Sequence, residues 1–304
     1  MTSSPIRAPN RLDIGLMVLA AMIWASGFVA IRIAVPETGP VWLAALRVGI
    51  GVLILLPYGL WRGMVWPQGA AQWLLIFGMA MLNVVVPFIM ISWAGLTLDA
   101  SVMSLLMGTG PFLALLGSHL FTDDDRMTTR KLVSVLLGFA GIVVLVGPSA
   151  FSGLGSGSLL AQLVMLAASC SYVTAGLLIR QIRMPPVRLA GLALTIGASA
   201  LFPIAFFVEG SPQIGLSWPA MGALVYLGVF PTGIAYILRF RLIRAIGYSR
   251  FSLTINMIPV FGMALGVFLL GEPLTINSVA ALALVLSGLY VAAGRDPSQS
   301  AAQS

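Results

Sequence analysis

The stretch DASVMSLLMGTGPFLALLGSHLF at residues 99–121 reappears in altered form as GYSRFSLTINMIPVFGMALGVFLL at residues 247–270. At an offset of 148 positions, Ser101 matches Ser249 and Pro111 matches Pro259. Farther along, an offset one residue shorter aligns Gly141 with Gly288. Self-similarity at a long, nearly fixed spacing indicates a duplicated structural unit. We therefore predict that the chain is built from two copies of one unit.

The matched positions form a stripe of small and polar residues along one face of each predicted helix. Residues spaced i, i+3, i+7 and i+10 share a helical face; here they are Ser101, Ser104, Gly108 and Pro111 in one copy and Ser249, Ser252, Asn256 and Pro259 in the other. Such stripes mark either close helix packing or the wall of a central cavity. We expect packing near the serines and cavity lining near the prolines.

The composition is that of a membrane protein with many spans. Of the 304 residues, 59% are hydrophobic and only 8% are charged, and the mean hydropathy is +1.03. A soluble domain carries about 25% charged residues, so this chain has too few charges to cover a surface in water. The net charge of +7 does not indicate nucleic-acid binding, because the basic residues fall in short gaps between apolar runs.

Ten apolar runs are each close to the roughly 20 residues that a spanning helix needs. They are predicted at about 14–34, 40–60, 70–93, 98–121, 128–146, 158–180, 187–208, 217–240, 247–270 and 275–293. Five runs fall in residues 13–147 and five in 158–294, joined by a Gly/Ser-rich linker at 148–157 and flanked by tails at 1–12 and 295–304. Because five is odd, the second unit enters the membrane from the opposite side. The predicted fold class is an all-α polytopic membrane protein with two inverted five-helix repeats.

Basic residues fix the predicted orientation. The tails and every second loop contain nearly all the Lys and Arg, whereas the other loops contain Asp99, Glu209 and Glu272 but no Lys or Arg. By the positive-inside rule, the N and C termini are both predicted to be cytoplasmic. Arg32 and Arg47 break this pattern, because they lie within spans near the opposite side.

The sequence lacks the residues that several classes of function require. All nine acids lie in tails, loops or helix ends, so no mid-span carboxylate is available as a proton-coupling site. We therefore favour facilitated movement of a solute over proton exchange. The single cysteine, Cys170, lies in an apolar run and is interpreted as a small buried residue. Nothing in the sequence indicates a catalytic residue, a metal or a cofactor, and a monomer is compatible with it.

Polar, aromatic and small residues near the middle of spans are the candidates for substrate binding, because lipid offers them no hydrogen bonds. They are Trp24, Asn83, Met107, Gly108, Thr109, Ser169, Tyr172, Phe230 and Asn256. Helix packing or an interhelical hydrogen bond explains each about as well as a substrate contact does. Trp24 and Tyr172 would suit an amphipathic solute.

Four prolines and two ionisable groups complete the predicted site. Pro87, Pro111, Pro231 and Pro259 each free a backbone carbonyl within a span, which permits kinks and gating motions. Arg47 and His119 are candidates for a buried charge. The alternative for Arg47 is contact with headgroups or with Glu37, and for His119 an interfacial position near Asp123.

The chain resembles the EamA-type branch of the drug/metabolite transporter superfamily over residues 11–294. The likeness rests on Trp24-Ala-Ser-Gly-Phe28, Pro40 with Leu46-Arg47, Gly138 with Gly141, Tyr226-Leu-Gly228, Asn256-Met-Ile-Pro259 and Gly271-Glu272-Pro273-Leu274. It implies a ten-helix exporter of small metabolites in a bacterial inner membrane, with a cavity lined by helices one, three, four, six, eight and nine. Amino-acid exporters of the YddG kind are similar in length and plan.

The resemblance also implies an aromatic lining on helix four, where this chain has Gly108-Thr109-Gly110. An exclusively aromatic substrate and a wider, less selective cavity are therefore both open. The predicted function is export of amino acids, aromatic or otherwise hydrophobic, or of related small metabolites, by alternating access. The alternatives are export of nucleosides, nucleotide sugars or drugs and, more remotely, an intramembrane lipid-modifying enzyme.

Overall fold

The computed structural model describes residues 7–61, 63, 66–121, 127–147 and 157–293, and within these ranges the chain is helical and contains no strand. Two short segments, η1 and η3, are π-helical. In chain order the elements are α1 (Arg11–Thr38), α2 (Pro40–Trp61), α3 (Ala70–Ala80), η1 (Met81–Val85), α4 (Val86–Ala94), α5 (Ala100–Met107), α6 (Gly110–Phe121), α7 (Thr129–Val146), α8 (Gly157–Ile179), α9 (Pro186–Glu209), α10 (Trp218–Val229), η3 (Phe230–Ile234), α11 (Ala235–Ile246), α12 (Tyr248–Asn256), α13 (Ile258–Leu270) and α14 (Ile276–Ala293).

Nine helices in the described part of the chain are long and apolar enough to cross a membrane. They correspond to the first nine predicted runs, because four of the spans combine consecutive elements: α3–η1–α4, α5–α6, α10–η3–α11 and α12–α13. The tenth predicted run is the shorter apolar helix over Ile276–Ala292. The structure thus confirms a polytopic all-helical membrane protein.

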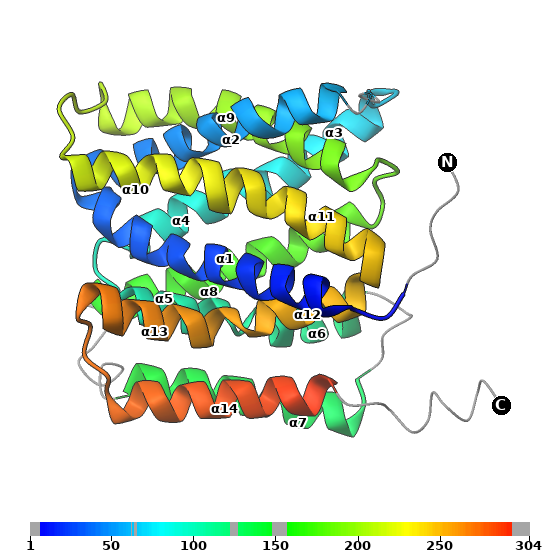
Figure 1. Cartoon of the computed structure of the whole chain (residues 1–304), viewed down its shortest axis with the longest axis vertical. Helices are drawn as coiled ribbons and strands as arrows, with labels where there is room; N and C mark the ends of the chain where they lie inside the picture. The colour runs from blue at the N-terminus through cyan, green and yellow to red at the C-terminus, as the bar shows by residue number, and fades with distance from the viewer. Residues whose placement is uncertain (1–6, 62, 64–65, 122–126, 148–156, 294–304) are drawn as a thin grey trace.

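The helices run side by side along one direction of the bundle, and α1 begins at the same end at which α14 finishes (Figure 1). The most extensive contacts pair α2 with α9, α7 with α14, α5 with α13, α1 with both α10 and α13, and α4 with α8. Each pair therefore joins one helix from the first half of the chain to one from the second half.

The serine stripe on α5 lies in a tight helix–helix contact. A Cβ atom on Gly262 of α13 would collide with Ser104, and one on Gly108 would collide with Pro259. Ser101 and Ser104 are both buried, as expected where small residues let two backbones approach closely. This agrees with the expectation of packing near the serines. Near the prolines, Gly108 and Ile258 border a cavity, while Pro259 itself packs against Gly108.

The chain's three glutamates bind the N-termini of other helices at the end of the bundle away from the start of α1 (Figure 1). Glu209 accepts backbone N–H groups at the start of α2, Glu272 at the start of α5, and Glu37 at the start of α10, with N···O distances of 2.6 to 2.9 Å. The first N–H groups of a helix have no partner within it, and its N-terminus favours negative charge. These acids therefore stabilise the ends of helices.

Asp99 lies near the same helix ends. Burial raises the pKa of the Asp99 carboxyl, and the negative charge of Glu272 adds to that shift, whereas Arg32 opposes it. The Arg32 guanidinium lies 3.8 Å from the Asp99 carboxylate and also donates to the carbonyl of Gly95. The loop acids therefore have structural partners on the protein itself.

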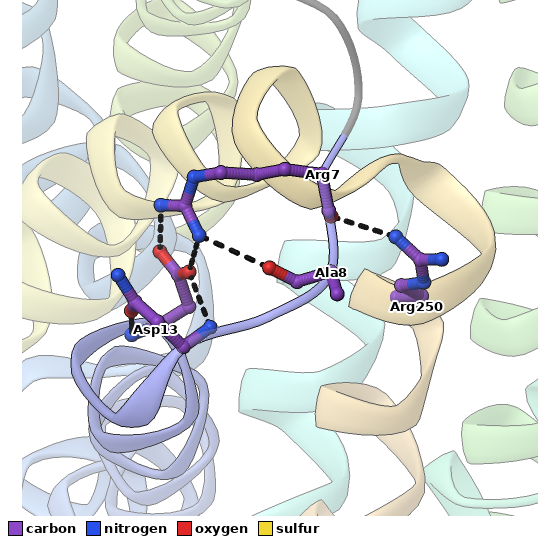
Figure 2. A network of polar contacts seen from close by, with 5 residues as sticks. Arg7, Ala8, Asp13 and Arg250 are labelled. Atoms are coloured by element: carbon purple, nitrogen blue, oxygen red, sulfur yellow. Dashed lines mark hydrogen bonds and ion pairs between the residues drawn. The ribbon is translucent and has the colours of Figure 1, made fainter.

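The residues before α1 are bound to α1 and to the region where α11 ends and α12 begins (Figure 2). The Arg7 guanidinium pairs with the Asp13 carboxylate, which also accepts the N–H of Asn10 in a capping box. The backbone N–H of Arg7 donates to Ala245 at 3.1 Å, and Arg250 donates to the Arg7 carbonyl at 2.6 Å. Residues 7–10, part of the predicted tail at 1–12, thus contact α1, α11 and α12.

The positions of Cys170 and His119 decide between their interpretations, and for His119 the exposed helix end agrees with the interfacial alternative and not with a buried charge. Cys170 is exposed on the surface of α8, so its interpretation as a buried residue is wrong. His119, near the end of α6, is also exposed, and its Nδ1 accepts the N–H of Met127 at 3.2 Å. Its predicted neighbour Asp123 lies outside the described residues.

Candidate functional site: a central cavity

A cavity of about 220 Å³ lies between the two halves of the chain. Both halves contribute to its wall, from α1, α2, η1, α4 and α5 on one side and from α8, η3, α11, α12 and α13 on the other. Sites for drug-sized ligands occupy roughly 300–1,000 Å³. This cavity therefore suits a small metabolite.

Aromatic side chains from several helices form much of the wall. They are Trp24, Phe28, Phe88, Tyr172 and Tyr236. On the predicted fourth helix, the family resemblance implies aromatic residues where this chain has Gly108-Thr109-Gly110. The structure provides aromatic surface from α1, α4, α8 and α11 instead, while Gly108 allows the close approach of Pro259.

Arg47 is buried in this wall, with only 7% of its surface exposed. Its guanidinium carbon lies 4.1 Å from the centre of the Phe88 ring, a distance typical of a cation–π contact. Its Nε lies 3.5 Å from the hydroxyl of Thr232, at the long limit for a hydrogen bond. The alternative pairing with Glu37 is not seen, because Glu37 binds Ser217 at the start of α10.

Arg239 on α11 is a second basic residue in the wall, and sequence reasoning missed it. Its position near the end of a predicted span made it a topology signal. The spacing of Tyr236 and Arg239, three residues apart on one helical face, was the available signal for a shared lining role. The Arg239 Nε is buried and has no hydrogen-bond partner among the described residues.

The π-helical segments lie where the cavity wall is built. In η1 the N–H of Val86 bonds to Met81, five residues back, instead of Leu82. Pro87 has no N–H to offer, and the Leu82 carbonyl instead accepts the hydroxyl of Ser171 on α8 at 2.7 Å. The irregular turn is thus satisfied from a neighbouring helix, as buried backbone groups require. Asn83, in the same turn, lines the cavity.

The second π-helical segment follows the same rule. In η3 the N–H of Ala235 bonds to Phe230 instead of Pro231, and the Pro231 carbonyl accepts the indole N–H of Trp24 on α1 at 3.3 Å. Because Pro231 cannot donate, the Leu227 carbonyl accepts the Thr232 hydroxyl at 2.8 Å. Cavity residues therefore take part directly in the hydrogen bonds of this turn.

Five of the nine predicted binding residues line the cavity: Trp24, Asn83, Met107, Gly108 and Tyr172. The other four, Thr109, Ser169, Phe230 and Asn256, are not in the cavity wall. Ser169 lies behind the wall and donates to the Met107 sulfur at 3.4 Å. Thr109 caps its own helix through Leu106, and Phe230 stacks on Tyr226 with ring centres 5.0 Å apart.

The four predicted kink prolines each follow or occupy an interruption in a span. Pro87 follows η1, Pro231 lies in η3, and Pro111 and Pro259 follow the breaks between α5 and α6 and between α12 and α13. Of the four, Pro231 lines the cavity.

Apolar helices of spanning length around a small cavity define a polytopic membrane protein built to hold a solute. The EamA-like transporter family model matches residues 12–147 and again residues 156–294. The chain belongs to this family of transporters.

Known relatives agree with that assignment. The chain is 27% identical to an uncharacterized transporter of Archaeoglobus fulgidus over 91% of its own length and 96% of the relative. It is 26% identical to a probable amino-acid metabolite efflux pump of Salmonella typhimurium, over 93% and 95% of the two chains. A crystal structure with 22% identity matches at a TM-score of 0.67, over 92% of this chain and 98% of the other, a likeness of fold.

Proposed function

We propose that this transporter exports amino acids or related small metabolites by alternating access of two inverted five-helix repeats. The central cavity carries the proposal, because it is small, lies between the two halves of the chain and contains polar groups within an apolar bundle. A solute site at the interface of two repeats is the usual arrangement in such transporters. The Salmonella relative, a probable amino-acid metabolite efflux pump, supports amino-acid metabolites as the solute class.

The pairing of helices supports the inverted-repeat arrangement. When each span is exchanged with its counterpart in the other repeat, α1 is replaced by α8 and α10 by α4. The α1–α10 contact then becomes the α8–α4 contact. The same exchange maps the pairs α2–α9 and α7–α14 onto themselves. In this proposal α14 is the tenth span, and the basic residues at the end of the bundle where α1 begins face the cytoplasm of a bacterial inner membrane.

We propose that the five predicted residues in the wall, together with Arg47, contact the solute, and that the four prolines permit the gating motions. The size of the cavity favours this solute class over nucleotide sugars and drug-sized molecules. Acid–base catalysis needs a positioned group that can take up and release a proton, and His119 lies at the protein surface instead. That position makes an intramembrane enzyme a weaker explanation.

Flux into liposomes tests the proposal. Purified protein is reconstituted, and entry of labelled aromatic, branched and hydroxylated amino acids is followed with and without a pH gradient. We expect saturable flux that does not depend on the gradient, and a lower rate in Asn83→Ala at unchanged folding. Absence of saturable flux for all of these solutes and their deaminated analogues would contradict the proposal.

A further inference from the structure

Two guanidinium groups line the central cavity, and no acid among the described residues lies with them. Arg47 enters from α2 and Arg239 from α11, so the two charges come from opposite halves of the chain. The wall also contains aromatic rings, aliphatic side chains and the amide of Asn83. The fixed charge of the wall is therefore positive.

The described acids are engaged elsewhere. Asp13 pairs with Arg7, Asp99 lies beside Arg32, and the three glutamates bind helix N-termini at one end of the bundle. A buried charge without a counter-charge is costly. Within the described part of the chain, no carboxylate lies beside the two cavity cations, and the buried Arg239 Nε has no acceptor. An occupant with negative charge would supply what the wall lacks.

The chemistry of the wall favours a carboxylate. A guanidinium presents a planar set of N–H donors that matches the two oxygens of a carboxylate. The Arg47 guanidinium lies over the Phe88 ring and its Nε meets the Thr232 hydroxyl, so two contacts restrict its position. Trp24, Tyr172 and Tyr236 offer apolar surface for the rest of the solute.

An ammonium group would find no carboxylate among the described wall residues, and the Asn83 amide is the one side-chain carbonyl among them. The α-amino group of an amino acid usually needs a carboxylate or several carbonyl acceptors, and aromatic faces alone attract it weakly. In this wall it would also be repelled by two guanidinium groups at low dielectric. A solute with a carboxylate and no ammonium avoids this cost.

We propose that the central cavity selects net-anionic carboxylates with an apolar or aromatic body, held by Arg239 and Arg47, over zwitterionic amino acids of the same shape. This rests on the proposed function and narrows its solute class to deaminated or N-acylated relatives of amino acids. Arg239 supplies the free donor, and Arg47 is held in place by Phe88 and Thr232.

Three probes that share a phenylethyl group test the selection: 3-phenylpropanoate, L-phenylalanine and phenethylamine. They carry a carboxylate alone, both groups, and an ammonium alone. Binding is measured as the shift in thermal unfolding of the full chain in detergent, since a ligand that binds the native state stabilises it. We expect the largest shift with 3-phenylpropanoate, with a Kd at least tenfold below that of phenylalanine, and no shift with phenethylamine.

Variants of α11 locate the site. Arg239→Gln should weaken binding of 3-phenylpropanoate at least tenfold, and Arg239→Lys should restore part of it. Arg241→Gln is the matched control, because Arg241 lies two residues along the same helix, is exposed and is not in the cavity wall. Equal loss in both variants would overturn the role of Arg239.

The remaining outcomes separate this inference from the proposed function. Binding of phenylalanine as tight as that of 3-phenylpropanoate, or any shift with phenethylamine, would overturn the charge selection and leave amino-acid export standing. Selective binding of the anion without saturable flux of phenylpyruvate into liposomes would support the selection and contradict the transport proposal. No binding of any probe would overturn the selection.

Discussion

The two π-helical turns, η1 and η3, share one backbone arrangement but differ in how they are connected to the cavity. Both put a cavity residue in the turn, Asn83 in η1 and Pro231 in η3, and both have a bypassed carbonyl that accepts a hydrogen bond from another helix. In η1 the donor is Ser171, a small buried residue. In η3 the donor is Trp24, which itself lines the cavity.

This difference in donors makes η1 a purely structural turn, whereas η3 is hydrogen-bonded to residues of the cavity wall. The η1 carbonyl is satisfied within helix packing, independently of what the cavity holds. The η3 turn is linked to the cavity twice, through Trp24 and through Thr232, whose hydroxyl also meets Arg47. A change in the wall residues Trp24 or Arg47 therefore alters a contact of η3, whereas the Leu82–Ser171 hydrogen bond of η1 involves no wall residue.

Each turn also packs against a glycine, and filling that space should have the largest effect. A Cβ on Gly51 would lie 2.7 Å from Thr232 in η3, and one on Gly197 would lie 2.7 Å from Val84 in η1. Gly51→Ala and Gly197→Ala should each destabilise the protein by about 3 kcal/mol through overpacking. Thermal or denaturant unfolding in detergent measures this. Gly176→Ala on α8, where a Cβ meets nothing within 4 Å, is the control and should unfold like the native chain.

Removing the Thr232 hydroxyl should make η3 resemble η1, which has Val84 in its corresponding packing position. Thr232→Val keeps the shape but leaves the buried Leu227 carbonyl without its donor. We expect a loss of about 2 kcal/mol of stability together with a change in transport, because Arg47 loses its contact. Thr232→Ser, which keeps the hydroxyl, should retain most of both properties. Unchanged flux in Thr232→Val would show that η3 is no more closely joined to the cavity than η1.

Ser171→Ala tests the structural turn. The Leu82 carbonyl would lose its donor inside helix packing, which should cost about 1 kcal/mol. Because Ser171 is not in the cavity wall, the KM for the transported solute should stay the same while the unfolding midpoint falls. A raised KM would contradict the separation of the two turns.

Trp24→Phe should have the smallest effect on stability and a clear effect on transport. The Pro231 carbonyl loses the indole N–H but borders the cavity, where water can replace the donor. We expect a loss below about 1 kcal/mol, with a changed KM. Ser171→Ala should change stability more than KM, and Trp24→Phe should change KM more than stability. If both variants change stability and KM to the same extent, the distinction between η1 and η3 is removed.

The spans were predictable because hydrophobic length is set by the membrane and is visible in single runs of sequence. The positions of the breaks were also accessible, since a proline removes an N–H wherever it stands. The π-helical turns were not predicted. They depend on donors such as Ser171 and Trp24, which are far away in sequence and are brought near only by the packing of α1 and α8.

The site was predictable only in part, because the packing of distant helices decides which mid-span side chains face the cavity. Asn83 and Asn256 look equivalent as mid-span amides, and only the rotation of each helix decides that Asn83 faces the cavity. Arg239 was assigned to topology by its place near a loop, although α11 carries it into the wall. The glutamates gave no local signal of their role, because each one stabilises a helix that is distant in the sequence.

The exposed position of Cys170 gives the native chain a built-in attachment point. It is the single cysteine in the sequence, and it lies on the outer surface of α8, next to Ser171 and two residues before the cavity residue Tyr172. A maleimide dye could attach at this one place only, and because Cys170 lies within the α8 span, its rate of reaction would report how far water reaches this side of the helix. An environment-sensitive fluorophore there would report movement of α8 in the unaltered transporter.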